Sequence, residues 1–74
     1  MEQGIKLPDA RVLTPKEITL VRALADGLSN AQQAEMTGYT EGSVGVMRSL
    51  AVKKAGCTSS AHLVAVCIRQ KLIS

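Results

Sequence analysis

The stretch SNAQQAEMTGYTEGSVGVMRSLAVKKAG, from Ser29 to Gly56, decides the fold. Ser29 is a good N-cap and Gln32, three residues later, completes a capping box, so a short helix begins here. Gly38 stands where that helix must end, because glycine adopts the left-handed conformation of a helix C-terminus without strain. Thr40 then caps a longer helix that ends at Gly56. Two helices joined by a short, glycine-containing turn predict a helix-turn-helix, whose second helix enters the DNA major groove.

A further helix is predicted on each side of this stretch. Thr14 caps the earlier one, Glu17 closes its capping box, and Asp26-Gly27 ends it. Ser59 is the better cap for the last helix, whose apolar residues cover more than half of its circumference. We expect one side of that helix to face the core and the remainder to face a second subunit. The sequence therefore predicts an all-α fold, a four-helix bundle.

The domain organisation is simple. Residues 1–12 are polar and include Gly4 and Pro8, which discourage a regular element. We predict a flexible N-terminal arm over 1–12 and a helix-turn-helix DNA-binding domain over 13–74. The arm is interpreted as a frayed terminus or as a segment that reaches the minor groove. At 74 residues, with a single aromatic side chain, the chain is one small helical domain.

Charge is unevenly distributed along the chain, whose net charge is +3. All six acidic residues precede Gly42, whereas the segment from Ser43 to Ser74 has five basic residues and no acidic residue. A basic half that begins inside the second helix of the motif suits a polyanionic partner. The alternative interpretation is a solvated surface that only maintains solubility.

Catalysis and metal binding are not expected. Cys57 and Cys67 are interpreted as reduced thiols, and with the lone His62 they do not supply four zinc ligands. No glycine-rich phosphate loop or paired carboxylates accompany the histidine. We therefore predict no enzymatic activity, no cofactor and no metal. No apolar run is long enough to span a membrane.

The ordered set of residues resembles the LuxR/GerE-type DNA-binding domain from Leu13 to Ile73. The matching positions are Leu13-Thr14, Glu17, Gly27-Leu28-Ser29-Asn30, Ala34-Glu35, Gly38, Thr40-Glu41, Ser43-Val44, Arg48, Lys54, Gly56, Ser59, Ala61, Leu63-Val64-Ala65 and Leu72-Ile73. The resemblance implies a four-helix bundle, transcription regulation and a homodimer formed through the fourth helix. It implies a cytoplasmic protein, bacterial or phage-encoded and associated with the nucleoid. In the family a sensing domain usually precedes this unit, but here only residues 1–12 precede it. The chain therefore resembles a stand-alone, GerE-like member or a fragment of a longer protein.

The third helix departs from the family pattern. Gly45 replaces a lysine, Met47 a histidine and Leu50 a residue that is often polar; the other departures are Gln33, Thr37, Ala51 and Ala55, where the family has larger apolar residues. Gly42 and Gly45 each cost about 0.8–1.0 kcal/mol of helix propensity relative to alanine, so we expect the start of this helix to fray easily. Val46 and Leu50 are expected on its exposed face, where they meet thymine methyl groups or another protein.

Two functions are compatible with these observations. The first is a small DNA-binding transcriptional regulator, a homodimer that inserts the third helix into the major groove of double-stranded DNA. The second is a protein-interaction module that binds and inhibits a full-length LuxR-type regulator. The predicted DNA-binding residues are Ser29, Asn30, Thr40, Ser43, Val46, Arg48, Ser49, Lys53 and Lys54. The predicted dimerisation residues are Leu63, Val66, Cys67 and Gln70.

In the DNA-binding interpretation each group of residues has a role. Ser29, Asn30, Thr40 and Ser43 contact phosphates at helix N-termini, where backbone amides and the helix dipole attract anions. Val46 and Ser49 face base edges. The remaining basic residues of the third helix contact the DNA backbone or a guanine.

Overall fold

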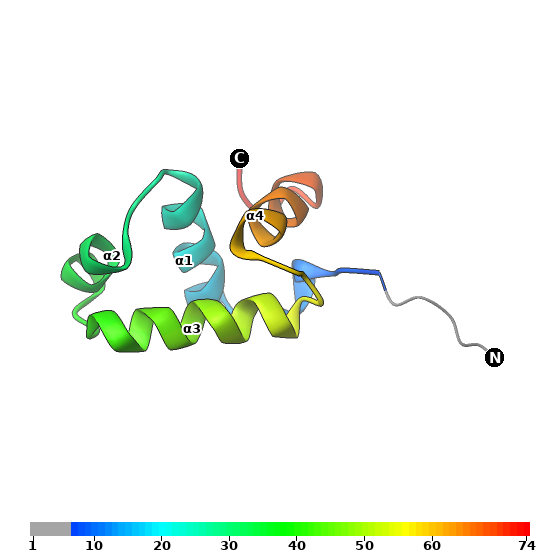
Figure 1. Cartoon of the computed structure of the whole chain (residues 1–74). Helices are drawn as coiled ribbons and strands as arrows, with labels where there is room; N and C mark the ends of the chain where they lie inside the picture. The colour runs from blue at the N-terminus through cyan, green and yellow to red at the C-terminus, as the bar shows by residue number, and fades with distance from the viewer. Residues whose placement is uncertain (1–6) are drawn as a thin grey trace.

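The computed structural model describes residues 7–74, which form one short 3-10 helix and four α-helices without any strand (Figure 1). The elements are η1 (Ala10–Val12), α1 (Pro15–Ala25), α2 (Asn30–Thr37), α3 (Glu41–Lys54) and α4 (Ser60–Arg69). The all-α, four-helix bundle predicted from the sequence is thereby confirmed. In Figure 1, α3 runs along one edge of the molecule, and the other helices all lie on the same side of it.

Each α-helix begins directly after the residue predicted to cap it. The hydroxyl oxygen of the cap accepts a hydrogen bond from the backbone amide three residues later, at 3.0 to 3.3 Å. In α1 and α2 the reciprocal bond is also present, because Glu17 and Gln32 each accept from the amide of the cap at 2.8 Å. Local side-chain chemistry therefore determines where the helices start.

The turn between α2 and α3 depends on Gly38. Its φ of 82° lies in the left-handed region, which glycine adopts without a side-chain clash. The Gly38 amide donates to the carbonyl oxygen of Ala34 at 2.9 Å, and the Tyr39 amide donates to the Thr37 hydroxyl at 3.3 Å. The chain thus reverses direction in three residues, and α2 packs against α3 as the predicted helix-turn-helix requires.

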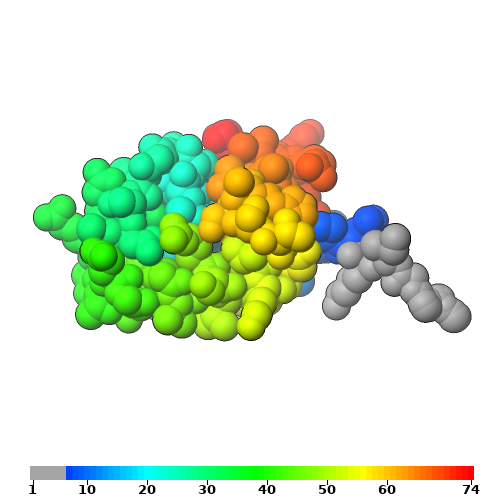
Figure 2. Space-filling view, in the orientation of Figure 1, coloured from blue at the N-terminus to red at the C-terminus, as the bar shows by residue number. Residues whose placement is uncertain are grey.

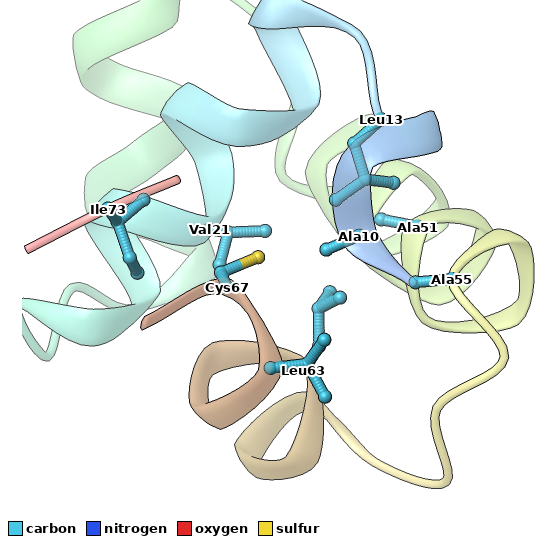
Figure 3. Close-up of a cluster of buried hydrophobic side chains, with 9 residues drawn as sticks. Ala10, Leu13, Val21, Ala51, Ala55, Leu63, Cys67 and Ile73 are labelled. Carbon is cyan, nitrogen blue, oxygen red and sulfur yellow. The ribbon is translucent and has the colours of Figure 1, made fainter. Parts of the chain in front are cut away.

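The core lies between α1, α4, η1 and the second half of α3 (Figure 3). Leu63 of α4 is fully buried in a cluster with Val21 of α1. Ala51 of α3 and Ala55, the residue that follows its C-terminal end, are also buried there. Their short side chains leave room for Ala10, which is completely buried beside them. Small residues on α3 thus allow a close approach of the neighbouring backbone instead of leaving a thin core.

The N-terminal boundary differs from the prediction. Residues 1–6 of the predicted arm lie outside the described residues, but Asp9 to Val12 belong to the packed structure. Asp9 caps η1 through its carboxylate, and its amide donates to the Ala55 carbonyl oxygen at 2.9 Å. Hydrogen bonds from Arg11 hold the pKa of Asp9 well below its usual range. The composition of residues 1–12 does not indicate this packing, because the burial of the small residue Ala10 leaves no local pattern in the sequence.

The predicted dimerisation residues need a correction. Leu63, Val66 and Cys67 are buried inside the bundle, with at most 2% of their surface exposed. Gln70 is occupied as well, because its side-chain oxygen accepts a hydrogen bond from the Ala10 amide at 2.8 Å. The apolar circumference of α4 is wide because this helix packs on several segments of its own chain. These four side chains are therefore used within the monomer.

Two polar residues at positions expected to be apolar in the family are satisfied locally. Gln33 is buried, and its amide nitrogen donates to the Leu28 carbonyl oxygen at 3.1 Å. The Thr37 hydroxyl donates to the Gln33 carbonyl oxygen at 2.7 Å. An apolar cavity of about 50 Å³ remains beside Gln33, between α1, α2 and α3. These polar residues are compatible with the helix-turn-helix because the Gln33 amide nitrogen and the Thr37 hydroxyl each find an acceptor on α2 or just before it.

The glycines of α3 and of the turn give the first prediction. A Cβ at Gly42 meets nothing within 4 Å, and one at Gly45 meets only the Asn30 side chain at an ordinary 3.5 Å. We expect Gly42→Ala and Gly45→Ala each to raise the free energy of unfolding by about 0.8–1.0 kcal/mol, the difference in helix propensity. Gly38→Ala is expected to lower it by about 1 kcal/mol, because alanine is strained at positive φ.

Urea unfolding followed by far-ultraviolet circular dichroism measures these differences. Gly38→Ala is the matched control, since it adds the same methyl group at a position where the backbone conformation opposes it. Destabilisation by alanine at either α3 position would show that the helix needs glycine there for an internal reason.

Candidate nucleic-acid interface

One side of α3 is buried and the other is open to solvent. Val44, Ala51 and Ala55 face the bundle with no more than 2% of their surface exposed. Val46 and Leu50 lie on the opposite side and expose more than half of their surface. In Figure 2 the spheres of α3 form the uncovered lower edge of the molecule. The open side leaves α3 accessible for insertion into a groove of a nucleic acid.

The first half of the open side adjoins the turn that precedes α3. Thr40, Ser43 and Val46 line a shallow depression together with Lys16 and Tyr39. The structure thus brings together three of the predicted DNA-binding residues. Lys16 was not predicted, because it belongs to the first turn of α1 and no local pattern connects it with α3. The packing of α1 against α3 is what brings the Lys16 side chain there.

The hydroxyl groups at the start of α3 are already engaged with one another. Thr40 accepts from the Ser43 amide at 3.0 Å, and its hydroxyl lies 2.9 Å from the Ser43 hydroxyl. Both residues are exposed. The backbone amides of the first helical turn that have no partner within the helix point out of its end, which favours an anion there.

The second half of the open side adjoins the loop between α3 and α4. Arg48, Ser49 and Lys53 line a second depression with Thr58 and Ser60. Arg48 is half-buried and Lys53 is exposed. Three predicted residues therefore meet at this end too, and the loop contributes hydroxyl groups that sequence reasoning did not assign. No periodic pattern indicated them, because the loop is folded back onto the end of α3 by backbone hydrogen bonds from the Gly56 and Cys57 amides to the Lys53 and Val52 carbonyl oxygens, at 3.0 and 2.9 Å.

The start of α2 contributes less than expected. Ser29 is exposed, but its hydroxyl already caps α2. Asn30 is half-buried with its side-chain amide nitrogen toward Gly45, and its side-chain oxygen is buried without a hydrogen-bond partner. Because Gly45 has no side chain, the Asn30 amide occupies the space beside the α3 backbone.

Lys54 has a structural partner. Its ammonium nitrogen lies 2.8 Å from a carboxylate oxygen of Glu17, the residue that closes the capping box of α1. Burial raises the pKa of Glu17, but hydrogen bonds from Lys54 and from Thr14 more than offset this, so the pKa lies below its ordinary value. Lys54 therefore links the end of α3 to the start of α1, whereas the exposed Lys53 extends from the open side.

The remaining reactive groups do not form a second site. Cys57 and Cys67 are free thiols, and burial raises the pKa of both. Within residues 7–74, no three histidine, cysteine or carboxylate side chains gather as metal ligands. None of the helices in this range has the length and apolar character needed to cross a membrane.

Comparison with known proteins gives a match to a transcription factor. Over 65 residues the chain is 42% identical to the transcriptional activator protein TraR of Rhizobium radiobacter. This similarity supports a LuxR-type helix-turn-helix at the level of the family. The match covers 88% of this chain but only 28% of TraR, within the C-terminal region of that protein. No protein-family model matches the chain, and no solved structure matches it significantly.

The two adjacent lysines of α3 give the second prediction. We expect Lys54→Ala to lower the free energy of unfolding at neutral pH by about 0.5–1 kcal/mol, because it removes the partner of a largely buried carboxylate. Lys53→Ala removes the same charge from the exposed side and is expected to change stability by less than about 0.5 kcal/mol. Chemical unfolding of the two variants measures the difference, and equal stabilities would contradict the structural role of Lys54.

The pH dependence follows from the lowered pKa of Glu17. A carboxyl whose pKa is lower in the folded state stabilises the fold above its unfolded pKa and loses this contribution as pH falls through the folded pKa. Glu17→Gln keeps the capping box but not the charge. We expect wild type to be more stable than Glu17→Gln at pH 7 and this advantage to shrink below pH about 4.3, the ordinary glutamate pKa. An advantage independent of pH would contradict the ion pair.

Proposed function

We propose that this chain is a sequence-specific DNA-binding transcriptional regulator that inserts α3 into the major groove. The observation that carries the proposal is the open side of α3, which is bordered by basic and hydroxyl side chains at both ends. From Ser43 to Ser74 the sequence contains no acidic residue, and the carboxylate of α3 is that of Glu41, its first residue. The similarity to the C-terminal region of TraR supports the same function.

The two depressions suggest how the domain is positioned on the duplex. Lys16, Thr40 and Ser43 would contact one stretch of the phosphate backbone at the start of α3. Arg48 and Lys53 would contact the other at its end. Phosphate contacts at both ends of one helix fix its register in the groove, which leaves the middle of α3 to contact base edges.

A selection experiment tests this function. The purified protein is incubated with random duplex DNA at two salt concentrations, and the bound DNA is sequenced. We expect an enriched motif, with an affinity that falls steeply as salt rises because phosphate contacts release counterions. Failure to enrich any motif at either salt concentration would contradict the proposal.

A pair of variants checks which cations contact DNA. Lys53→Ala is expected to weaken binding on all sequences alike and to reduce the slope of log affinity against log salt by about 1. Arg69→Ala removes the same charge from an exposed position near the end of α4 and should leave the slope unchanged. Equal effects of the two variants would indicate a response to net charge alone.

We also propose a homodimer, through the part of α4 that the bundle leaves uncovered. Ala61, Ala65 and Ile68 are exposed at helical spacing, and 49% of the Ile68 surface is accessible. Two small residues beside a large apolar one permit close approach of a second α4. This surface differs from the one predicted from the sequence, whose residues are Leu63, Val66, Cys67 and Gln70.

Ile68→Glu tests the dimer. We expect wild type to self-associate at micromolar concentration and the variant to remain monomeric, because a carboxylate would be desolvated in the contact. Sedimentation equilibrium measures the association, and circular dichroism checks that the exposed substitution preserves the fold. A wild-type protein that stays monomeric at high micromolar concentration would contradict the proposal.

A second candidate function is capture and inhibition of a full-length LuxR-type regulator. The observation that favours it is the exposure of two large apolar side chains, Val46 and Leu50, on the helix expected to contact DNA. Under this function Leu50→Asp would abolish binding to the regulator, whereas Lys53→Ala would have little effect. Co-sedimentation with a purified full-length regulator distinguishes it from DNA binding.

A further inference from the structure

The open side of α3 is apolar at its centre. Val46 exposes 59% of its surface and Leu50 exposes 54%, and the two residues are four positions apart on one helix. Gly42, one turn before Val46, adds no side chain and faces open space. The centre of the proposed DNA-binding helix therefore presents an apolar stripe, Gly42–Val46–Leu50, between polar ends.

Nothing inside the protein accounts for this stripe. Val46 and Leu50 do not belong to the buried cluster, nor do they pack against it as Val52 does. The Gly42 backbone is not in the left-handed region, so the residue is not required there by its conformation. Glycine is otherwise used where a backbone must approach a ligand closely.

The surroundings favour DNA over protein as the occupant. Gly42 and Val46 line the depression that also contains Lys16 and Ser43, and Leu50 follows Val46 on the same side of the helix. Arg48 and Lys53 line the second depression at the end of α3. The sole carboxylate of α3 belongs to Glu41, its first residue. Two apolar side chains among cations are a small patch compared with the roughly 800 Å² that each partner buries in a standard protein interface. A polyanion that also carries apolar groups would contact both the basic side chains and the apolar stripe.

The major groove offers one apolar group, the C5-methyl of thymine. Valine and leucine form no hydrogen bonds with their side chains, so contact with that methyl group is their way of recognising a base. Residues four apart on a helix are separated by about 6 Å along its axis, close to two base-pair steps of about 3.4 Å. Val46 and Leu50 are thus spaced for two thymines about two steps apart.

We infer that Val46 and Leu50 read thymine methyl groups in the major groove, which makes Leu50 a specificity-determining residue. The inference rests on the proposed function, since it names what the open side of α3 recognises. Gly42 allows the start of the helix to approach the groove, while Lys53 holds the phosphate backbone. In this arrangement hydrophobic contact supplies base selectivity that a lysine at position 45 would otherwise supply by hydrogen bonding.

The test uses the duplex enriched in the selection experiment, with each thymine replaced in turn by deoxyuridine. Deoxyuridine keeps the base pair and the O4 acceptor but lacks the methyl group. We expect the affinity of wild type to fall about fourfold at each of two thymines roughly two steps apart, the factor given by burial of one methyl group. Fluorescence anisotropy at fixed salt measures the ratio of the two affinities.

Matched variants assign each methyl group to a side chain. Leu50→Ala is expected to bind thymine and deoxyuridine equally at one of the two positions only, and Val46→Ala at the other only. Lys53→Ala is expected to weaken both duplexes while preserving their ratio. All three residues are exposed, so circular dichroism should show an unchanged fold.

The outcomes separate the inference from the function on which it rests. Salt-sensitive binding to an enriched motif, with no loss at any deoxyuridine, would overturn the methyl readout and leave DNA binding in place. A loss that Leu50→Ala does not remove would overturn the role of Leu50. Absence of any enriched motif, together with binding of a LuxR-type regulator that Leu50→Asp abolishes, would overturn both proposals and assign the stripe to a protein partner.

Discussion

The structure depends on one constraint: α3 is buried along a single side. Val44 packs toward α1 and α2, while Ala51 and Ala55 pack toward η1 and α4. Because these alanines are small, the backbone at Asp9 comes close enough to bond to the end of α3. The helices α1, α2 and α4 all contact α3, and α4 also contacts α1 and η1, while the opposite side of α3 is left open. The same packing that buries one side of α3 therefore exposes the side that forms the candidate site.

The basic residues of α3 have different tasks. Lys54 is held by Glu17, whose carboxylate also closes the capping box of α1. One carboxylate therefore stabilises the start of α1 and fixes its position against the end of α3. Lys53, the preceding residue, is exposed on the open side. A formal count of positive charges would treat the two lysines as equivalent, but their partners make one structural and the other available to an anion.

The departures from the pattern that the resemblance predicts are accommodated in an all-α, four-helix fold. Gln33 is buried where an isoleucine is expected, and the Leu28 carbonyl oxygen satisfies its amide. The glycines of α3 lower helix propensity, yet the helix runs unbroken from Glu41 to Lys54 because tertiary contacts stabilise it. On the open side, where no packing restricts the choice of residue, the divergence leaves an apolar stripe that changes the surface presented to a partner.

The sequence by itself determined the four helices and their caps, because N-capping hydroxyls and the left-handed Gly38 act over three or four residues and leave a local pattern. It also determined which side of α3 is open at Val46 and Leu50. Only the tertiary structure decided that Asp9 to Val12 belong to the bundle, that Leu63 and Cys67 are core residues, and that Lys16 lies beside the start of α3. These facts depend on contacts between segments that are distant in the chain. The periodicity of one segment does not indicate which other segments pack against it.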